Sequence, residues 1–283
     1  MEYKLLKIGT DAEIFWKNSV GDPVPSIGLL PGTKYEPTTI TSLGNGFTIH
    51  EDNVMPEFGI PPATTPEEFS ENISKMLGWL EDFGLSRELQ TDISPAKFFL
   101  PSQLAHPQAQ EFGCDPDWCV WTRKVNKVDM FSPIVKQLRT AAAHIHVSFT
   151  VDGHPPEVIE AEPLVQMLDL AFLPFLFINN EEDMIRRQLY GKAGAYRYKE
   201  YSETIKGIEY RVLSNIWIRH PKLTMFVFNQ IRWVFDTISA FSDLIPNLSK
   251  NLQQSIDKKD LTTAKRLIRE YGVPLPAGVT LNV

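Results

Sequence analysis

Four segments of the chain alternate apolar and polar residues in a way that is typical of β-strands. The clearest is Ala143–Val151, where isoleucine, valine and phenylalanine alternate with two histidines and a serine. Residues 4–16, 47–59 and 208–214 are predicted strands by the same criterion. Because successive side chains of a strand point to opposite faces, each segment would gather its polar groups on one side of a sheet.

Helical patterns account for much of the remaining chain. Thr65 is a predicted N-cap, followed by Pro66 at the first helical position and a helix to about residue 83, stopped by Gly84. Apolar spacing predicts further helices at the positions 162–179, 221–241 and 260–271, and residues 182–190 are a short helix or a loop. Strands concentrate before residue 215 and helices after it, which favours an α+β fold over alternating βαβ units.

The predicted strands carry polar pairs with two-residue spacing. Asp11 and Glu13 share one face of the first strand, and His144 and His146 share one face of the 143–151 strand, with Ser148 beside them. Two imidazoles inside an apolar strand are the most specific of these signals, since buried polar groups need partners.

Two further strands have the same arrangement. Glu209 and Arg211 place an acid and a guanidinium on one face. If 47–59 is one strand, Glu51 and Glu57 also share a face, although Pro56 would restrict this segment to an edge or a bulge. Each pair alone is also compatible with a solvated surface or a cross-strand charge pair.

Composition excludes several classes of protein. The 283-residue chain has a net charge of −7, which argues against a general nucleic-acid binder. Its start has no secretory signal pattern, and its longest apolar run, residues 164–178, is too short to span a membrane. Cys114 and Cys119 are expected to be reduced thiols, so we expect a cytoplasmic protein, in the host cytoplasm if it is phage-encoded.

The candidate chemistry combines carboxylates with arginines. Carboxylates bind Mg²⁺ together with substrate phosphates, and a histidine among them also suits Mn²⁺. Arg186, Arg187, Arg197 and Arg211 lie within 26 positions, and guanidinium groups bind phosphate through a planar fork. This combination is what phosphoryl transfer requires. The pattern of a P-loop is missing around Lys192, and no H-E-x-x-H motif of a zincin protease occurs.

In order along the chain, these motifs resemble the carboxylate–amine ligase superfamily of glutamine synthetase and γ-glutamylcysteine ligase. The fuller strings GTDAE at 9–13, DNVMPE at 52–57, YGKAGAYR at 190–197 and GIEYRVLSN at 207–215 are similar to the phage-encoded amidoligase type 2 branch. The resemblance covers about residues 4–220. It implies a single catalytic domain over 1–283, with a curved, mostly antiparallel sheet, helices on its outer face and a helical C-terminal region at 221–283.

The resemblance also implies roles for individual residues. The implied ligands of two or three Mg²⁺ or Mn²⁺ ions are Asp11, Glu13, Glu57, His144 and Glu209. His146 and Ser148 match positions close to ATP, Arg187 and Arg197 would contact phosphates, and Arg211 would face the transferred phosphate. A carboxylate such as Glu51 could accept the proton of the amine.

The expected activity is therefore an ATP-dependent ligase that joins a carboxylate substrate to an amine substrate through an acyl phosphate. The phage branch suggests substrates of peptide or protein type, such as cell-wall or virion material. Three alternatives stay open: a small-molecule kinase of related fold, a metal-dependent hydrolase that needs no ATP, and a non-enzymatic virion or metal-binding protein. Product analysis, the ATP requirement and the effect of Glu57 or His144 substitutions on metal affinity separate them.

Overall fold

A computed structural model describes residues 1–110, 117–128, 133–241 and 243–281 of the chain. The strands are β1 (Tyr3–Glu13), β2 (Phe15–Lys17), β3 (Pro23–Val24), β4 (Gly32–Thr33), β5 (Glu36–Thr39), β6 (Thr48–Asp52), β7 (Met55–Gly59), β8 (Gln90–Asp92), β9 (Ala96–Phe98), β10 (Trp118–Cys119), β11 (Lys124–Val125), β12 (Leu138–Thr140), β13 (Ala143–Val151), β14 (Ala195–Glu200) and β15 (Lys206–Tyr210). The α-helices are α1 (Pro66–Leu85), α2 (Pro107–Gln110), α3 (Val158–Ala171), α4 (Glu181–Arg186), α5 (Pro221–Phe241), α6 (Ser249–Lys258) and α7 (Leu261–Glu270). Short 3-10 helices span Pro133–Lys136, Leu173–Phe177, Asn215–Arg219 and Ile245–Leu248.

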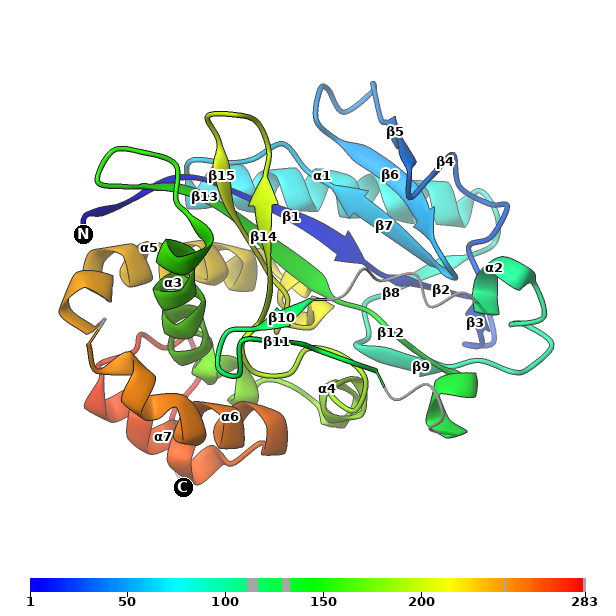
Figure 1. Ribbon diagram of the computed structural model, residues 1–283. Coiled ribbons are helices and arrows are strands. Elements are labelled where there is room, and N and C mark those ends of the chain that lie inside the picture. The colour runs from blue at the N-terminus through cyan, green and yellow to red at the C-terminus, as the bar shows by residue number, and fades with distance from the viewer. Residues whose placement is uncertain (111–116, 129–132, 242, 282–283) are drawn as a thin grey trace.

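Ten strands form one large sheet in the order β11-β10-β14-β15-β13-β1-β7-β6-β4-β5 (Figure 1). Its neighbouring strands run antiparallel, except that β4 and β6 meet in parallel at the bridge between Thr33 and Glu51. The long strands β1 and β13 are paired at the centre, from Tyr3 opposite Val151 to Ala12 opposite Ala143. The fold is therefore mixed α+β with a mostly antiparallel sheet, as the sequence predicts.

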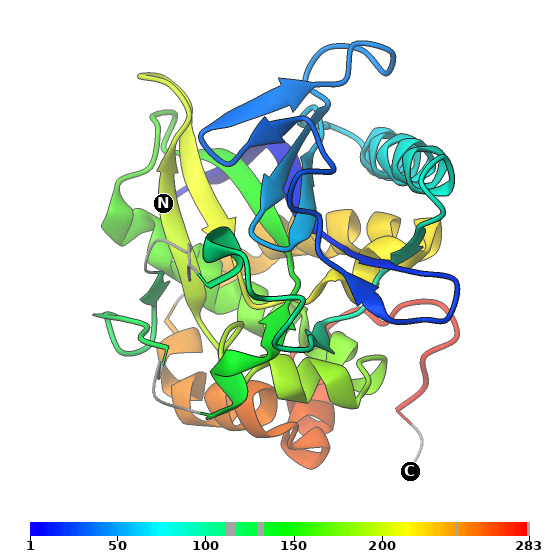
Figure 2. The same ribbon diagram turned by 90° about the vertical axis from the view of Figure 1, so that its right-hand side faces the viewer.

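One face of the sheet carries the hydrophobic core. Ile145, Val147 and Phe149 of β13 are fully buried, and the Phe149 ring contacts Phe235 of α5. Helix α5 packs against β1, α3 packs against α5 and β15, and α1 packs against α5 (Figure 2). Because strand side chains alternate, the polar residues between these apolar ones point to the opposite face.

Several predicted elements are confirmed. Strand β13 and helix α5 have the predicted bounds, and α7 begins after Asp260, whose carboxylate accepts the Thr263 N–H. Helix α1 begins after Thr65, whose hydroxyl accepts the N–H of Glu68.

The end of α1 differs from the prediction because Gly84 does not stop the helix. It lies inside the helix, against the Trp16 ring, where an added Cβ would be 2.6 Å from a ring carbon. Glycine is thus required here by packing, and the helix continues to Leu85.

Other predictions are wrong in their bounds. Residues 47–59 are not one strand but the hairpin β6–β7, in which Asp52 pairs with Met55 around a turn at Asn53. Asn53 has a φ of 58°, a left-handed conformation that asparagine tolerates in tight turns. The apolar helix begins at Val158 and gives way to a 3-10 helix after Ala171, and α6 was not predicted.

Cys119 is buried and forms no disulfide, while Cys114 lies outside the described residues. Over the part of the chain that the structure describes, none of the helices combines the length and the apolar character needed to cross a bilayer.

Candidate metal centre

The strand register brings polar side chains from six strands together on the face opposite the core. Asp11 of β1 pairs with His144 of β13, His146 pairs with Glu209 of β15, and Glu209 pairs with Arg197 of β14. On the other side of β1, Glu13 pairs with Glu57 of β7, which in turn pairs with His50 of β6. Paired residues project to the same side of a sheet, so these groups form one continuous polar surface.

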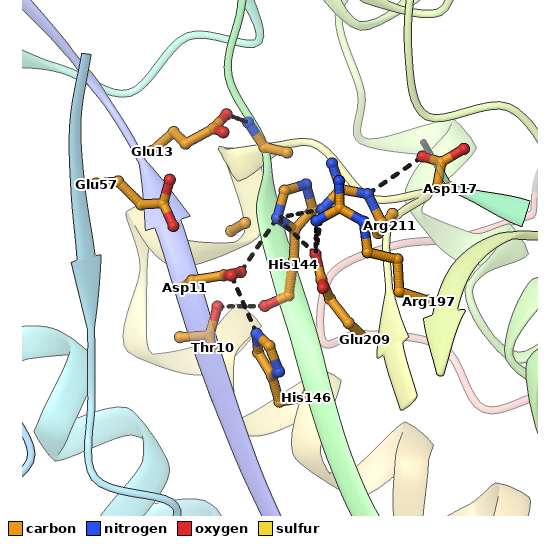
Figure 3. Close-up of polar contacts among 12 residues, drawn as sticks. Thr10, Asp11, Glu13, Glu57, Asp117, His144, His146, Arg197, Glu209 and Arg211 are labelled. Carbon is orange, nitrogen blue, oxygen red and sulfur yellow. Dashed lines mark hydrogen bonds and ion pairs between the residues drawn. The ribbon is translucent and has the colours of Figure 1, made fainter. Parts of the chain in front are cut away.

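A first group, the Asp11 cluster, consists of Asp11, His144 and Glu209. Each offers a ligand atom, and these atoms all lie within 4.8 Å of one another. Nδ1 of His144 is 3.1 Å from an Asp11 oxygen and 3.5 Å from a Glu209 oxygen (Figure 3). The hydroxyl of Thr10 donates to the His144 carbonyl at 2.6 Å and so ties β1 to β13 at this point.

A second group, the Glu13 cluster, consists of Glu13, Asp52 and Glu57, again with ligand atoms within 4.8 Å of one another. One Glu13 oxygen accepts the backbone N–H of Ala142 at 2.7 Å. Nε2 of His50 lies 3.5 Å from a Glu57 oxygen. Figure 3 shows Glu13 and Glu57 beside Asp11, so the two clusters are neighbours on the sheet.

Positive groups surround the Asp11 cluster. Burial alone would raise the pKa of Asp11, but attraction by His146 and His144 holds it well below its ordinary value. Burial and the Asp11 charge likewise oppose ionisation of Glu209, yet Arg211 and the two histidines lower its pKa to about 2. Burial, followed by repulsion from Arg211, lowers the pKa of His144 and so favours the neutral ring that can act as a ligand.

In the Glu13 cluster, the neighbouring charges are mostly negative, and they shift the pKa values in the opposite direction. Burial, followed by repulsion from Glu57 and Asp52, raises the pKa of Glu13 well above its ordinary value. Burial and the Asp11 and Asp52 charges do the same to Glu57. Three carboxylates held this close repel one another, and a divalent cation is the partner that would relieve the repulsion.

Arg211 follows β15 and lies between two acids. One Nη donates to Glu209 and also lies 3.3 Å from His144 Nδ1, while Nε donates to Asp117 at 3.2 Å (Figure 3). Asp117 is fixed by Asn126, whose side-chain amide donates to it at 2.7 Å. The guanidinium is therefore held in one orientation beside the Asp11 cluster.

Two more cations reach the same carboxylate from β14. Arg197 lies 3.3 Å from one Glu209 oxygen, and Lys199 lies 3.4 Å from the other. Lys199 is only partly covered, with 36% of its side chain exposed. It can therefore meet an anion from solvent, and the strand spacing places it next to Arg197 on the polar face.

A cavity opens beside the two clusters. Its carboxylates are Glu13, Asp52 and Asp117, and its cationic groups include Arg186 and Arg211. Apolar wall residues such as Met55, Leu138 and Leu189 complete it. The cavity thus combines carboxylate and guanidinium groups with apolar walls, which suits a small polar substrate.

The structure brings together all five predicted metal ligands, Asp11, Glu13, Glu57, His144 and Glu209, as well as Arg197 and Arg211. His146 also joins this group, since its Nε2 lies 3.1 Å from Asp11. Ser148 lies further along the same face, where its hydroxyl donates to the Lys7 carbonyl at 3.3 Å. Its hydrogen bond therefore joins β13 to β1.

Glu51 does not share a face with Glu57, so that prediction is wrong. It pairs with Pro56 in the hairpin, whereas Glu57 pairs with His50. One Glu51 oxygen accepts the backbone N–H groups of Leu29 and Leu30 at 3.0 and 3.1 Å. This carboxylate holds a loop and is not directed at either cluster.

Arg187 does not line this cavity, and its contact with phosphate stays a prediction. It is buried, its Nε donates to Asp183 at 3.0 Å, and its Nη1 donates to the Gly191 carbonyl. The neighbouring Arg186 lines the cavity instead and donates to the carbonyls of Val212 and Arg211. The orientation of helix α4 determines which of the two consecutive arginines faces the cavity.

Sequence reasoning missed Asp52, His50, Asp117 and Lys199. Asp52 and His50 follow from the hairpin, because the turn at Asn53 reverses the chain and puts both on the Glu57 face. The turn residue asparagine was the available signal. Lys199 lies two residues after Arg197 and follows from strand periodicity. Asp117 lies in an irregular segment without a pattern that could identify it.

Comparisons with known proteins give no family assignment. A scan against protein-family models found no match, and a search of curated proteins found none either.

Proposed function

We propose that this protein is an ATP-dependent carboxylate–amine ligase with a catalytic domain of the glutamine synthetase type. The observation that supports it most directly is the pair of acidic clusters on one sheet face, next to an arginine held between Glu209 and Asp117. Carboxylate clusters with adjacent guanidinium groups are what phosphoryl transfer between anionic partners needs.

The donor sets fit divalent cations that prefer oxygen. Glu13, Asp52 and Glu57 offer carboxylates only, which suits Mg²⁺, and the Asp11 cluster adds one imidazole, which suits Mn²⁺ equally. Burial and repulsion by neighbouring acids raise the pKa values of Glu13 and Glu57 and outweigh the attraction by Arg211. Bound Mg²⁺ or Mn²⁺ would supply Lewis-acid neutralisation of the phosphate oxygens.

In the proposed reaction, an oxygen of the substrate carboxylate attacks the γ-phosphorus of ATP and the bond to the β-phosphate oxygen breaks, giving an acyl phosphate and ADP. An amine then attacks the acyl carbon, and phosphate leaves as the amide forms. Arg211 is fixed in position to stabilise the charge on the transferred phosphoryl group. Arg197 and Lys199 are placed to hold the other phosphates of ATP.

The amine requires a carboxylate that can hold it and accept its proton. Glu51 cannot do so from its place in the loop contact with Leu29 and Leu30. Asp117 lines the cavity, belongs to neither cluster and is the carboxylate we assign to this task. The cavity would therefore receive the amine, and the substrate carboxylate would lie between it and ATP.

The test is ADP release in the presence of Mg²⁺, a carboxylic acid and an amine, followed by mass spectrometry of the product. The ligase predicts ADP release that requires both substrates, and an amide product. A phosphorylated product without amide indicates a kinase, and turnover without ATP indicates a hydrolase. Cation affinity that is unchanged in Glu57→Gln and His144→Ala would contradict the proposal and favour a non-enzymatic protein.

A further inference from the structure

His146 lies between two groups and contacts each with one ring nitrogen. Its Nε2 is 3.1 Å from an oxygen of Asp11, and its Nδ1 is 2.9 Å from the Tyr201 hydroxyl. The ring of Tyr201 also meets the imidazole edge-on, with centroids 5.9 Å apart. Both nitrogens are therefore engaged inside the protein, and this arrangement leaves neither of them to contact a nucleotide.

The partners determine which hydrogen bonds the two ring nitrogens make. A carboxylate only accepts hydrogen bonds, so Nε2 carries a hydrogen and donates it to Asp11. Nδ1 and the Tyr201 hydroxyl form the second hydrogen bond of the ring. The imidazole is thus held between the phenol and the carboxylate, and it holds the Asp11 oxygen that it contacts in one orientation.

We propose that His146 and Tyr201 are positioning residues that orient Asp11 for binding a divalent cation. The inference rests on the proposed cation site, because it assigns these residues to the support of one of its ligands. Hydrogen-bonded groups behind metal ligands fix ligand geometry, and replacing them typically weakens metal affinity by about 10–100-fold.

The position of Tyr201 links two ligands of the Asp11 cluster. Tyr201 begins the turn between β14 and β15, where its N–H donates to the Ile205 carbonyl at 2.9 Å. Its hydroxyl also lies 3.4 Å from the carbonyl of Ile208, the residue before Glu209. One side chain thus fixes the imidazole behind Asp11 and contacts the strand that presents Glu209.

The neighbouring Ser148 does not share the contacts of His146. Ser148 is two residues further along the same face of β13, yet its hydroxyl donates to a backbone carbonyl of β1. The two residues were predicted to share a role near ATP, and their contacts differ. His146 is bonded to a candidate ligand, and Ser148 is bonded to the backbone.

The experiment is a titration of metal-free protein with Mn²⁺ in the absence of nucleotide, with free Mn²⁺ followed by electron paramagnetic resonance. His146→Ala should weaken one cation site by about tenfold or more. His146→Gln should recover part of this affinity, because its amide can still donate to Asp11. Tyr201→Phe removes only a hydroxyl and should weaken the same site by roughly a few fold.

Two matched controls separate this effect from general damage. Tyr198→Phe removes a phenol hydroxyl from β14, three residues before Tyr201, where it donates to the Pro156 carbonyl. His154→Ala removes an exposed histidine from the turn after β13. Neither should change Mn²⁺ affinity. Affinity for ATP without divalent cation, measured in parallel, should be equal in wild type and in Tyr201→Phe.

Unchanged Mn²⁺ affinity in His146→Ala and Tyr201→Phe, with weaker ATP binding, would overturn the inference and make His146 a nucleotide contact. If His146→Ala does not fold, Tyr201→Phe alone decides, and wild-type Mn²⁺ affinity in it overturns the inference. A wild-type protein that binds no Mn²⁺ would overturn the cation site itself, and the inference with it. This outcome is distinguishable from the others because it precedes any substitution.

Discussion

The Asp11 cluster and the Glu13 cluster are neighbours on one sheet face, but their charge balance is opposite. The acids of the Asp11 cluster contact two histidines, two arginines and a lysine, and the pKa values of Asp11 and Glu209 are lowered. In the Glu13 cluster, burial and mutual repulsion raise the pKa values of Glu13 and Glu57.

This difference separates two ways of building a cation site. In the Asp11 cluster, hydrogen bonds and counter-charges hold the ligands in place before any cation arrives. In the Glu13 cluster, the fold forces acids together at a cost in stability, and a cation would recover that cost. Substitutions should therefore have opposite effects on the stability of the metal-free protein in the two clusters.

The largest effect on stability is expected from Arg211→Gln, which removes a positive charge that offsets the acids of the Asp11 cluster. It leaves Glu209 and Asp117 buried without their shared cation, which should lower the free energy of unfolding by about 3–5 kcal/mol. Urea denaturation measures this change. The control is Arg123→Gln, whose partner is Glu162 and whose side chain is 68% exposed. It should cost less than about 1 kcal/mol, and equal losses in the two variants would contradict the account.

Asp169 gives a reference for both clusters, because burial and not a neighbouring charge is the main cause of its pKa shift. It is fully buried behind the sheet and accepts hydrogen bonds from Trp121 and Tyr210. Burial, only partly offset by these bonds, raises its pKa to about 7. The folded state thus binds a proton that the unfolded state has released above pH 4, so stability falls as pH rises from about 4 to 7.

Asp169→Asn should remove this part of the pH dependence, which amounts to roughly 4 kcal/mol between pH 4 and 8. The measurement is the free energy of unfolding of both proteins in urea across this range. The test compares how steeply the free energy of unfolding changes with pH in the two proteins. Its absolute value is not compared, because the amide also rearranges the hydrogen bonds to Trp121 and Tyr210. Parallel pH profiles would show that Asp169 does not titrate in this range.

Glu57→Gln tests the repulsion in the Glu13 cluster. Removing one of three clustered charges should raise the stability of the chelator-treated protein by about 1–2 kcal/mol. The same substitution should reduce the further stabilisation by Mg²⁺, since one ligand is lost. Thermal unfolding with and without Mg²⁺ gives both values. A variant that is less stable without cation, yet is stabilised by Mg²⁺ like wild type, would refute this assignment.

The smallest effect is expected from Glu51→Gln, on the opposite face of the same hairpin. It weakens the hydrogen bonds to Leu29 and Leu30 and should cost about 1 kcal/mol. Because this carboxylate faces neither cluster, Mg²⁺ should stabilise the variant as it does wild type. If Mg²⁺ no longer stabilised the Glu51→Gln variant, Glu51 would be part of the cation site after all.

The sequence was sufficient to predict the parts of the site that depend on strand periodicity. Asp11 with Glu13 and His144 with His146 lie on the predicted faces, because these strands are long and regular. Periodicity failed where the chain reverses, so Glu51 was assigned to the face of Glu57 and Asp52 was overlooked. It also could not decide between Arg186 and Arg187, because the rotation of the short helix α4 depends on tertiary contacts such as those of Arg186 with the carbonyls of Val212 and Arg211.

Asp117 and Tyr201 show a different limit. Both come from turns or irregular segments, and they reach the site through contacts with Arg211 and His146 that join distant parts of the chain. Such contacts leave no local pattern in the sequence.

The most direct test of the account is the number of cations bound by the metal-free protein, measured by titration with Mn²⁺. The two clusters predict two bound ions in wild type and in Glu51→Gln. Glu57→Gln should lose one of them, and His144→Ala should lose the other. Wild-type binding in both variants, or no binding to wild type, would contradict the central claim that the two clusters are cation sites.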